Sequence, residues 1–260
     1  MPNLPMHIYL ASRVAESLDW DWVNDHVGSL WLGSTAPDIR AMTKWPRERT
    51  HFAPLSAEEV GAGPRALFQL HPELAGRHGL SPATRAFLVG YVCHLMADEA
   101  WIASIYRPYF GAPQAGGKGA TTEVEAHIWD RALQLDMDRK ALPQVGALLR
   151  DGEALSGAGV GVEVGFLDSG EMEEWCEWVR RFVGWEFTWE RLRRSLKRMY
   201  RDNDEVQQAV DGFIDDIPHS LERVYEKISP ETIEAFQQAA HDATLALVRE
   251  HWDQTQADDP

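Results

Sequence analysis

Hydrophobic residues recur along most of the chain at the three- and four-residue spacing that is typical of α-helices. No region shows the alternating pattern of β-strands, and no repeat of solenoid length is present. The pattern therefore predicts an all-α fold, a bundle of many helices. The predicted helices cover residues 6–18, 21–34, 56–70, 81–106, 121–139, 143–150, 170–183, 186–200, 203–227 and 230–253.

Capping residues and a glycine-rich stretch divide this pattern. Ser56 with Glu59 is a capping-box pattern, and Ser81 followed by proline marks the start of the longest predicted helix. The clearest break is the stretch 157–165, which we interpret as a linker or a short extended segment. We therefore expect a helical core over 1–156 and a C-terminal helical region over 166–260, packed together as one domain.

Composition limits the classes of protein that fit. A hydrophobic fraction of 44% with 11 Trp is enough for a large core, which argues against disorder. The net charge of −16 argues against binding of nucleic acid. We expect no signal peptide and no membrane span. Cys93 and Cys176 are far apart in apolar patterns, so we expect free thiols and a cytoplasmic location.

A histidine and a carboxylate lie one helical turn apart in the helix predicted over 81–106. His94 and Asp98 are four residues apart, so their side chains leave the same face and can share a metal ion. Such a pair is more often capped, salt-bridged or solvated. His7, Asp38 and His51 lie in comparable apolar or irregular surroundings. Histidine with carboxylate favours Zn²⁺, Mn²⁺ or Fe²⁺ over Cu⁺.

Four short motifs occur in order: MHIYLA at 6–11, GSTAPDI at 33–39, RTHF at 49–52 and GYVCHLMADEAW at 90–101. Together they resemble the zinc-dependent phospholipase C family over roughly residues 5–130. That family shares its helical fold with the S1/P1-type nucleases. The resemblance implies the same fold here, with the additional C-terminal helices beyond it.

The resemblance also implies a set of ligands. It assigns one zinc ion to Asp38, His51, His94 and Asp98, with Asp98 bridging towards a second ion near His7. His127 corresponds to a ligand further along. The family has a carboxylate one turn after that histidine and another histidine shortly after the bridging aspartate. In this sequence Arg131 stands one turn after His127, and Ser104 stands shortly after Asp98. We therefore expect one metal ion, keep a second open, and expect no third.

Basic residues gather between Asp38 and His51 in a chain that is acidic overall. We hypothesise that Arg40, Arg47 and Arg49 bind a phosphate or another anion beside the metal. Alternatively, they pair with nearby acids or are solvated.

The segment 191–201 combines six basic residues with Leu192, Leu196 and Met199 on one face. It can lie on an anionic membrane. Alternatively, it buries its apolar stripe in the domain.

These observations predict a zinc-dependent hydrolase that acts on a phospholipid headgroup or another small phosphoester. A metal ion lowers the pKa of bound water from ~16 towards ~7 and so supplies hydroxide at neutral pH. Asp98 would ligate and orient, and Glu99 or Glu123 would accept the proton. The alternative is a metal-binding helical scaffold with little or no hydrolytic activity. A phosphohydrolase built on His241 and Asp242 ranks last, because no partner for that pair is evident in the sequence.

Overall fold

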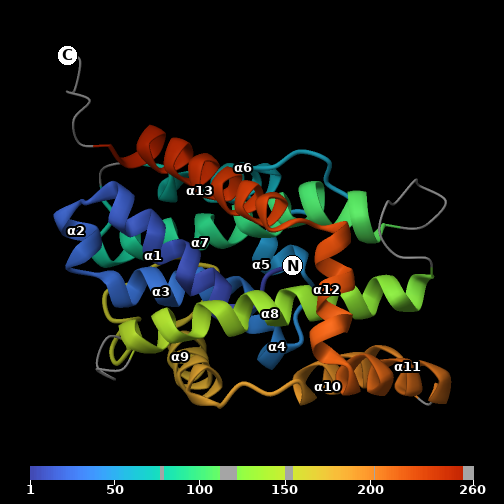
Figure 1. Ribbon diagram of the computed structural model, residues 1–260. Helices are drawn as coiled ribbons and strands as arrows, with labels where there is room; N and C mark the ends of the chain where they lie inside the picture. Colours follow the sequence, from blue (N-terminus) through green and yellow to red (C-terminus); the bar gives the residue numbers. More distant parts are fainter. Residues whose placement is uncertain (77–78, 112–121, 150–154, 202, 254–260) are drawn as a thin grey trace.

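The computed structural model describes residues 1–76, 79–111, 122–149, 155–201 and 203–253 (Figure 1). Within these ranges the chain forms helices joined by loops and contains no β-strand, which confirms the all-α prediction. In chain order the elements are α1 (Leu4–Leu18), α2 (Asp21–Asn24), α3 (Val27–Thr35), η1 (Ala36–Ile39), α4 (Arg40–Thr43), α5 (Glu48–His51), α6 (Ala62–Leu70), η2 (Pro72–Leu74), α7 (Pro82–Trp101), η3 (Ile102–Phe110), α8 (Glu123–Leu149), α9 (Ser169–Gly184), α10 (Glu190–Met199), α11 (Asp204–Asp215), α12 (Ile217–Lys227) and α13 (Pro230–Trp252).

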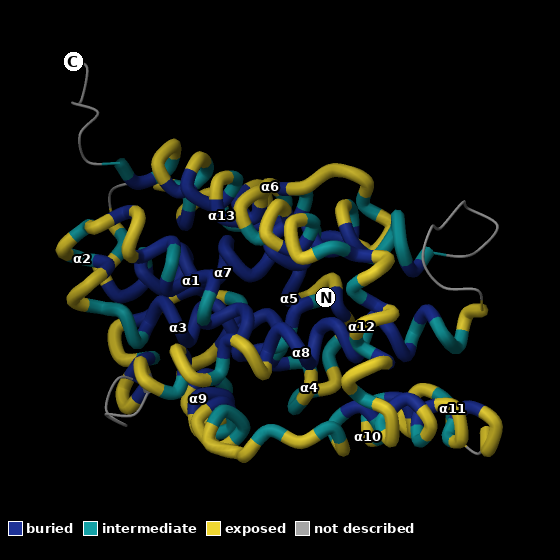
Figure 2. The backbone as a smooth tube through the Cα atoms, viewed as in Figure 1, coloured by how far each residue is buried: buried dark blue, intermediate teal, exposed yellow. Residues whose placement is uncertain are grey.

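Helix α7 is the central element, and it is buried along almost its whole length (Figure 2). The Ser81 side chain caps it by accepting a hydrogen bond from the Thr84 N–H at 3.0 Å, as the sequence predicted. Helices α1, α3 and α13 pack around it. The stretch Pro82–Phe110 is long and apolar enough to cross a membrane, but 94% of its most apolar window is buried inside the protein. Its hydrophobic length is thus used in the core.

Two glycines allow α3 and α7 to approach each other closely. A Cβ atom on Gly33 would lie 1.9 Å from the Phe87 carbonyl oxygen, and one on Gly90 would lie 1.9 Å from the Leu30 carbonyl oxygen. Both distances are far inside van der Waals contact, so any side chain at either position would push the helices apart. This contact places the end of α3 against the middle of α7, where His94 lies.

Several predicted helix boundaries were wrong. The Ser56 capping box does not form: α6 begins only at Ala62, and Glu59 lies before it and pairs with Arg65 at 2.9 Å. The ranges 21–34 and 203–227 each divide into two helices. By contrast, 121–139 and 143–150 join into α8, which continues through Pro143. Tertiary packing on the core overrides these local signals.

The hydrophobic core includes residues from both predicted regions, among them Ile8 and Trp252. Helix α13 packs on α7, and α10 and α12 pack on α8. The stretch 157–165 is a loop tied to the helical core, since Ser29 donates to the Ala158 carbonyl and Ser81 donates to the Gly161 carbonyl. The division at 156 and 166 stays a prediction.

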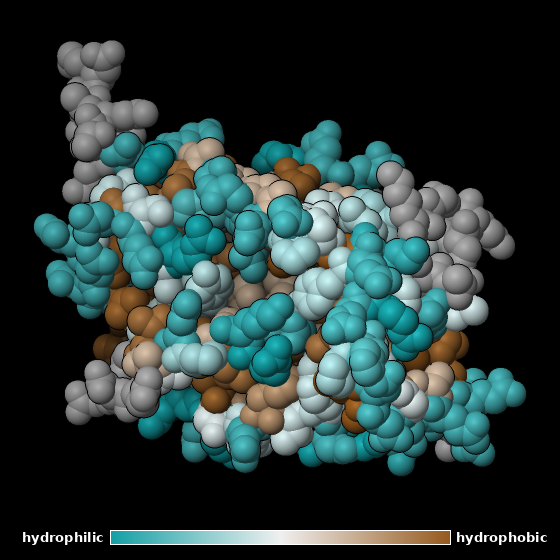
Figure 3. Space-filling view, viewed as in Figure 1, coloured by the Kyte–Doolittle hydropathy of each residue, from teal (hydrophilic) through white to brown (hydrophobic). Residues whose placement is uncertain are grey.

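The apolar stripe of α10 faces the interior. Leu192 and Leu196 are 0% exposed, whereas Met199 is 48% exposed. Leu192 and Leu196 of the stripe are therefore buried in the domain, which agrees with the second of the two interpretations of this segment. Peripheral contact with a membrane stays a prediction. The face drawn in Figure 3 is covered largely by hydrophilic side chains, with hydrophobic ones in small groups.

Candidate metal centre

Five of the predicted ligands come together from four elements. Helix α1 carries His7, η1 carries Asp38, α5 carries His51, and α7 carries His94 and Asp98. Asp98 lies at the centre of the group. Its Oδ1 is 3.5 Å from His7 Nε2, and its Oδ2 is 3.3 Å from His51 Nε2 and 3.8 Å from His94 Nε2. Asp38 Oδ1 lies 4.0 Å from His51 Nε2.

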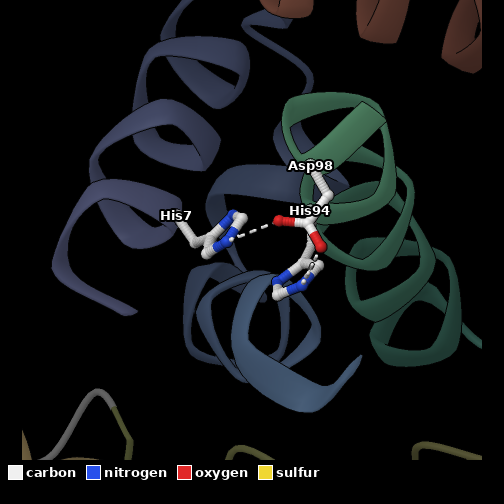
Figure 4. A group of neighbouring side chains, drawn as sticks. All are labelled: His7, His94 and Asp98. Atoms are coloured by element: carbon white, nitrogen blue, oxygen red, sulfur yellow. Dashed lines mark ion pairs between the residues drawn. The ribbon is translucent and has the colours of Figure 1, made fainter. Parts of the chain in front are cut away.

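The group is enclosed on most sides. His7, His51, His94 and Asp98 are each 1% exposed or less, while the side chain of Asp38 is 32% exposed. The rings of His7 and His94 stack with their centroids 3.7 Å apart, and both point towards the Asp98 carboxylate (Figure 4). Asp38 therefore marks the side that is open to solvent.

Two hydrogen bonds orient the histidine rings. His94 Nδ1 lies 2.8 Å from the Ser34 carbonyl oxygen and donates to it, because a carbonyl can only accept. His51 Nδ1 lies 3.0 Å from Thr50 Oγ1. Tyr91 fixes that segment by donating its hydroxyl to the Thr50 carbonyl. With Nδ1 engaged in the rings of His51 and His94, Nε2 of both faces Asp98 and is free to be a metal ligand.

The protonation states of the central pair suit a metal. Burial lowers the pKa of His94 well below its usual value, and the neighbouring His7 adds to this. Burial alone would raise the pKa of Asp98. However, His94 and the nearby imidazoles of His51 and His7 hold that pKa well below the usual value. His94 is therefore neutral and Asp98 ionised near neutral pH, which are the forms that bind metal.

Buried atoms without partners provide the test of whether a metal fits. Nε2 of His7, His51 and His94 and Oδ1 of Asp98 are all buried and have no hydrogen-bond partner. Leaving such atoms unsatisfied is unfavourable. The possible ligand atoms form two overlapping groups, and within each group they lie within 4.8 Å of one another. One group contains His7, His94 and Asp98, and the other contains Asp38, His51 and His94. Nitrogen and carboxylate donors in this arrangement fit Zn²⁺.

Thr50 provides a prediction about the orientation of His51. We expect Thr50→Val to lower zinc affinity by about 10- to 100-fold, because the lost hydroxyl no longer fixes the ring. Thr50→Ser keeps the hydroxyl and should stay close to wild type. Zinc affinity measured by competition with a chromogenic chelator checks this. Equal affinity in all three proteins would contradict the orienting role.

Only one of the three predicted anion-binding arginines enters the group. Arg47 is 9% exposed, and its Nη2 lies 2.9 Å from Asp98 Oδ2. Arg49 is exposed and places its guanidinium 3.3 Å from the centroid of the Trp45 ring. Arg40 Nε donates to the Trp45 carbonyl at 3.4 Å. Anion binding by Arg40 and Arg49 stays a prediction.

Glu99 has a different environment from Asp98. Its two carboxylate oxygens accept hydrogen bonds from the backbone N–H groups of Gly61 and Gly63, at 2.5 and 2.6 Å. Burial raises the pKa of Glu99. Both oxygens therefore hold the start of α6, and a role for Glu99 as proton acceptor stays a prediction.

His127 lies outside both ligand groups identified among the described residues. Its Nδ1 is hydrogen-bonded to the Tyr200 hydroxyl. The ring lines a cavity of about 320 Å³ together with Met1, Trp101 and Asp130. A metal role for His127 stays a prediction.

The late histidine pair does have a partner in the fold. His241 Nε2 lies 2.9 Å from Ser17 Oγ, and its Nδ1 lies 3.1 Å from Asp242 Oδ1. Ser17 stands in the last turn of α1, where the free backbone groups are carbonyls rather than N–H donors. If Ser17 acted as a nucleophile with His241 and Asp242, the end of α1 would therefore offer no backbone N–H donor to stabilise the oxyanion. We interpret the contact as a link between α1 and α13.

Sequence reasoning missed the groups that orient the ligands. Thr50 directly precedes His51 in the RTHF motif, so a hydroxyl next to a candidate ligand was an available signal. The Ser34 carbonyl had no such signal, because a backbone oxygen is the same in every residue.

Comparison with known proteins agrees with this geometry. Residues 6–101 match the family described as zinc dependent phospholipase C. No curated protein and no solved structure matches the chain. The matched region contains His7, Asp38, His51, His94 and Asp98 but ends before His127. Over residues 6–101 the chain is therefore similar to the zinc-dependent phospholipase C family.

Proposed function

We propose that the protein is a zinc-dependent hydrolase of phosphoesters. The observation that carries the proposal is the buried group of three histidines around Asp98, in which the three Nε2 atoms and Asp98 Oδ1 have no hydrogen-bond partners. The similarity of residues 6–101 to the zinc-dependent phospholipase C family supports the same metal and a phosphoester of the phospholipid type.

Each residue of the group would have a separate task. His51, His94, Asp98 and Asp38 would hold zinc, and His7 with Asp98 could hold a second ion. Zinc, when bound, would lower the pKa of a water molecule and polarise a phosphoryl oxygen. The partly exposed Asp38 lies where a substrate can enter.

Arg47 would bind the phosphoryl group itself. Its Nε and Nη1 are buried and have no hydrogen-bond partner, so both N–H groups are available to anionic oxygens. Contact with a developing negative charge would be stronger in the transition state than in the ground state, and would therefore increase the rate.

Removal of zinc tests the proposed function. We expect purified protein to contain at least one zinc ion per chain by elemental analysis. Dialysis against a chelator should abolish hydrolysis of phosphodiesters and phosphomonoesters, and added Zn²⁺ should restore it. Protein that contains zinc but turns over no phosphoester on a broad panel would favour the scaffold alternative. Protein without any transition metal would contradict both.

The substrate panel should include phospholipids with different headgroups and soluble phosphoesters of similar charge. The similarity to the phospholipase C family favours the lipids. The buried free thiols Cys93 and Cys176 fit a reducing compartment, and a cytoplasmic location stays a prediction. Contact with a membrane would have to use surfaces other than the buried stripe of α10.

A further inference from the structure

Arg47 approaches the oxygen that the proposed metal also needs. Its Nη2 lies 2.9 Å from Asp98 Oδ2, and that oxygen is 3.3 Å from His51 Nε2 and 3.8 Å from His94 Nε2. The oxygen and the two histidine nitrogens would be ligand atoms of the zinc ion that the proposed function assigns to Asp38, His51, His94 and Asp98. A carboxylate oxygen has lone pairs for two partners, so Arg47 and a metal ion can share it.

Sharing this oxygen brings two positive charges close together. Arginine stays protonated at all ordinary pH values, and the Arg47 side chain is only 9% exposed. Water therefore screens little of its repulsion of a divalent cation. By itself, Arg47 weakens metal binding.

An anion reverses this effect. Two donors of Arg47, Nε and Nη1, are buried without partners, so the guanidinium retains unused capacity for hydrogen bonds. A phosphoryl or phosphonate group has several oxygens and can bind both the guanidinium and the metal. Its negative charge lies between the two cations and offsets their repulsion.

From this geometry we infer that Arg47 couples metal binding to anion binding, so that each ligand raises the affinity of the protein for the other. Such coupling is reciprocal by thermodynamic necessity. The centre would hold its metal most tightly when a phosphoryl group is bound. The inference rests on the proposed function for the choice of zinc and a phosphoryl ligand.

Zinc affinity, measured by chelator competition with and without phenylphosphonate, tests this inference. Phenylphosphonate is chosen because it has the charge of a phosphoryl group but no ester to hydrolyse. In wild type we expect it to tighten zinc binding by about 5- to 150-fold, the usual range of coupling between sites. Without it, Arg47→Met should bind zinc more tightly than wild type. Adding phenylphosphonate should raise the zinc affinity of Arg47→Met only a little.

Arg65→Met is the matched control, because the Arg65 side chain is half exposed and pairs with Glu59 at 2.9 Å rather than with Asp98. It should show the wild-type coupling. Arg47→Gln is measured as well, so that the test can still be made if either Arg47→Met or Arg47→Gln fails to fold. Coupling that persists in the folded Arg47 variants, or zinc affinity that does not rise in them, would overturn the inference. Binding is measured without turnover, so an inactive protein that shows the coupling would contradict only the proposed hydrolysis.

Discussion

Asp98→Asn is expected to lose zinc and phosphoester hydrolysis together. Asp98 is the residue towards which His7, His51 and His94 all turn their Nε2 atoms, and the amide is a much poorer ligand than the carboxylate. Even a change in a residue that only supports a ligand lowers metal affinity by about 10- to 100-fold. We therefore expect a loss of zinc affinity of about a hundredfold or more.

The same change should also lower stability in the absence of metal. It removes the partner of the buried Arg47 guanidinium, and breaking a buried ion pair typically costs about 3–5 kcal/mol. Urea unfolding of the chelator-treated proteins measures this loss of stability.

Glu99→Gln, made in parallel, separates the two neighbouring carboxylates. Because Glu99 contacts backbone N–H groups of the loop before α6, we expect this variant to keep its zinc. Zinc content that is equal in wild type and Asp98→Asn, or that is lost in Glu99→Gln alone, would contradict the assignment of Asp98 as the central ligand.

Gly90→Ala is expected to destabilise the fold by about 3 kcal/mol or more. The added methyl group would lie 1.9 Å from the Leu30 carbonyl oxygen and 2.7 Å from the Ser34 amide nitrogen. Both are backbone atoms of α3, so α3 and α7 would have to separate. Overpacking of this kind usually costs about 1–3 kcal/mol, and a contact with rigid backbone falls at the upper end.

This substitution should also weaken zinc binding, because the Ser34 carbonyl that orients His94 would move with α3. Gly146→Ala is the control. Gly146 lies in α8, and a methyl group added there would have no atom of the described residues within 4 Å beyond its own helical surroundings. There the change should be neutral or stabilise by up to about 1 kcal/mol. Thermal unfolding that showed the same effect at both positions would contradict the close contact of α3 and α7.

The all-α class could be predicted because the hydrophobic period is a local property of the chain. Residues 6–18 show this, since their apolar positions lie within α1 and are buried. Boundaries were less predictable where long-range contacts compete. Ser56 and Glu59 form a good local start signal, but Glu99 binds the N–H groups of Gly61 and Gly63 and fixes the start of the helix there.

For the site, the sequence by itself determined which residues could ligate a metal. The one-turn spacing of His94 and Asp98 already placed both on one face of a helix, and the ordered motifs added His7, Asp38 and His51. Their convergence on Asp98 was decided by the tertiary structure, through the close contact of α3 with α7 at Gly33 and Gly90. Likewise, nothing in the sequence favoured one of Arg40, Arg47 and Arg49 over the others as the residue that binds an anion.

Only the fold turned Arg47 inward and left Arg49 on Trp45. The physical reason is that ligand chemistry belongs to single residues and helical spacing to short segments. Burial, hydrogen bonds and charge neighbours instead depend on which segments meet. The sequence thus determined the helical class and the candidate ligands, and the tertiary structure determined which of them share one site.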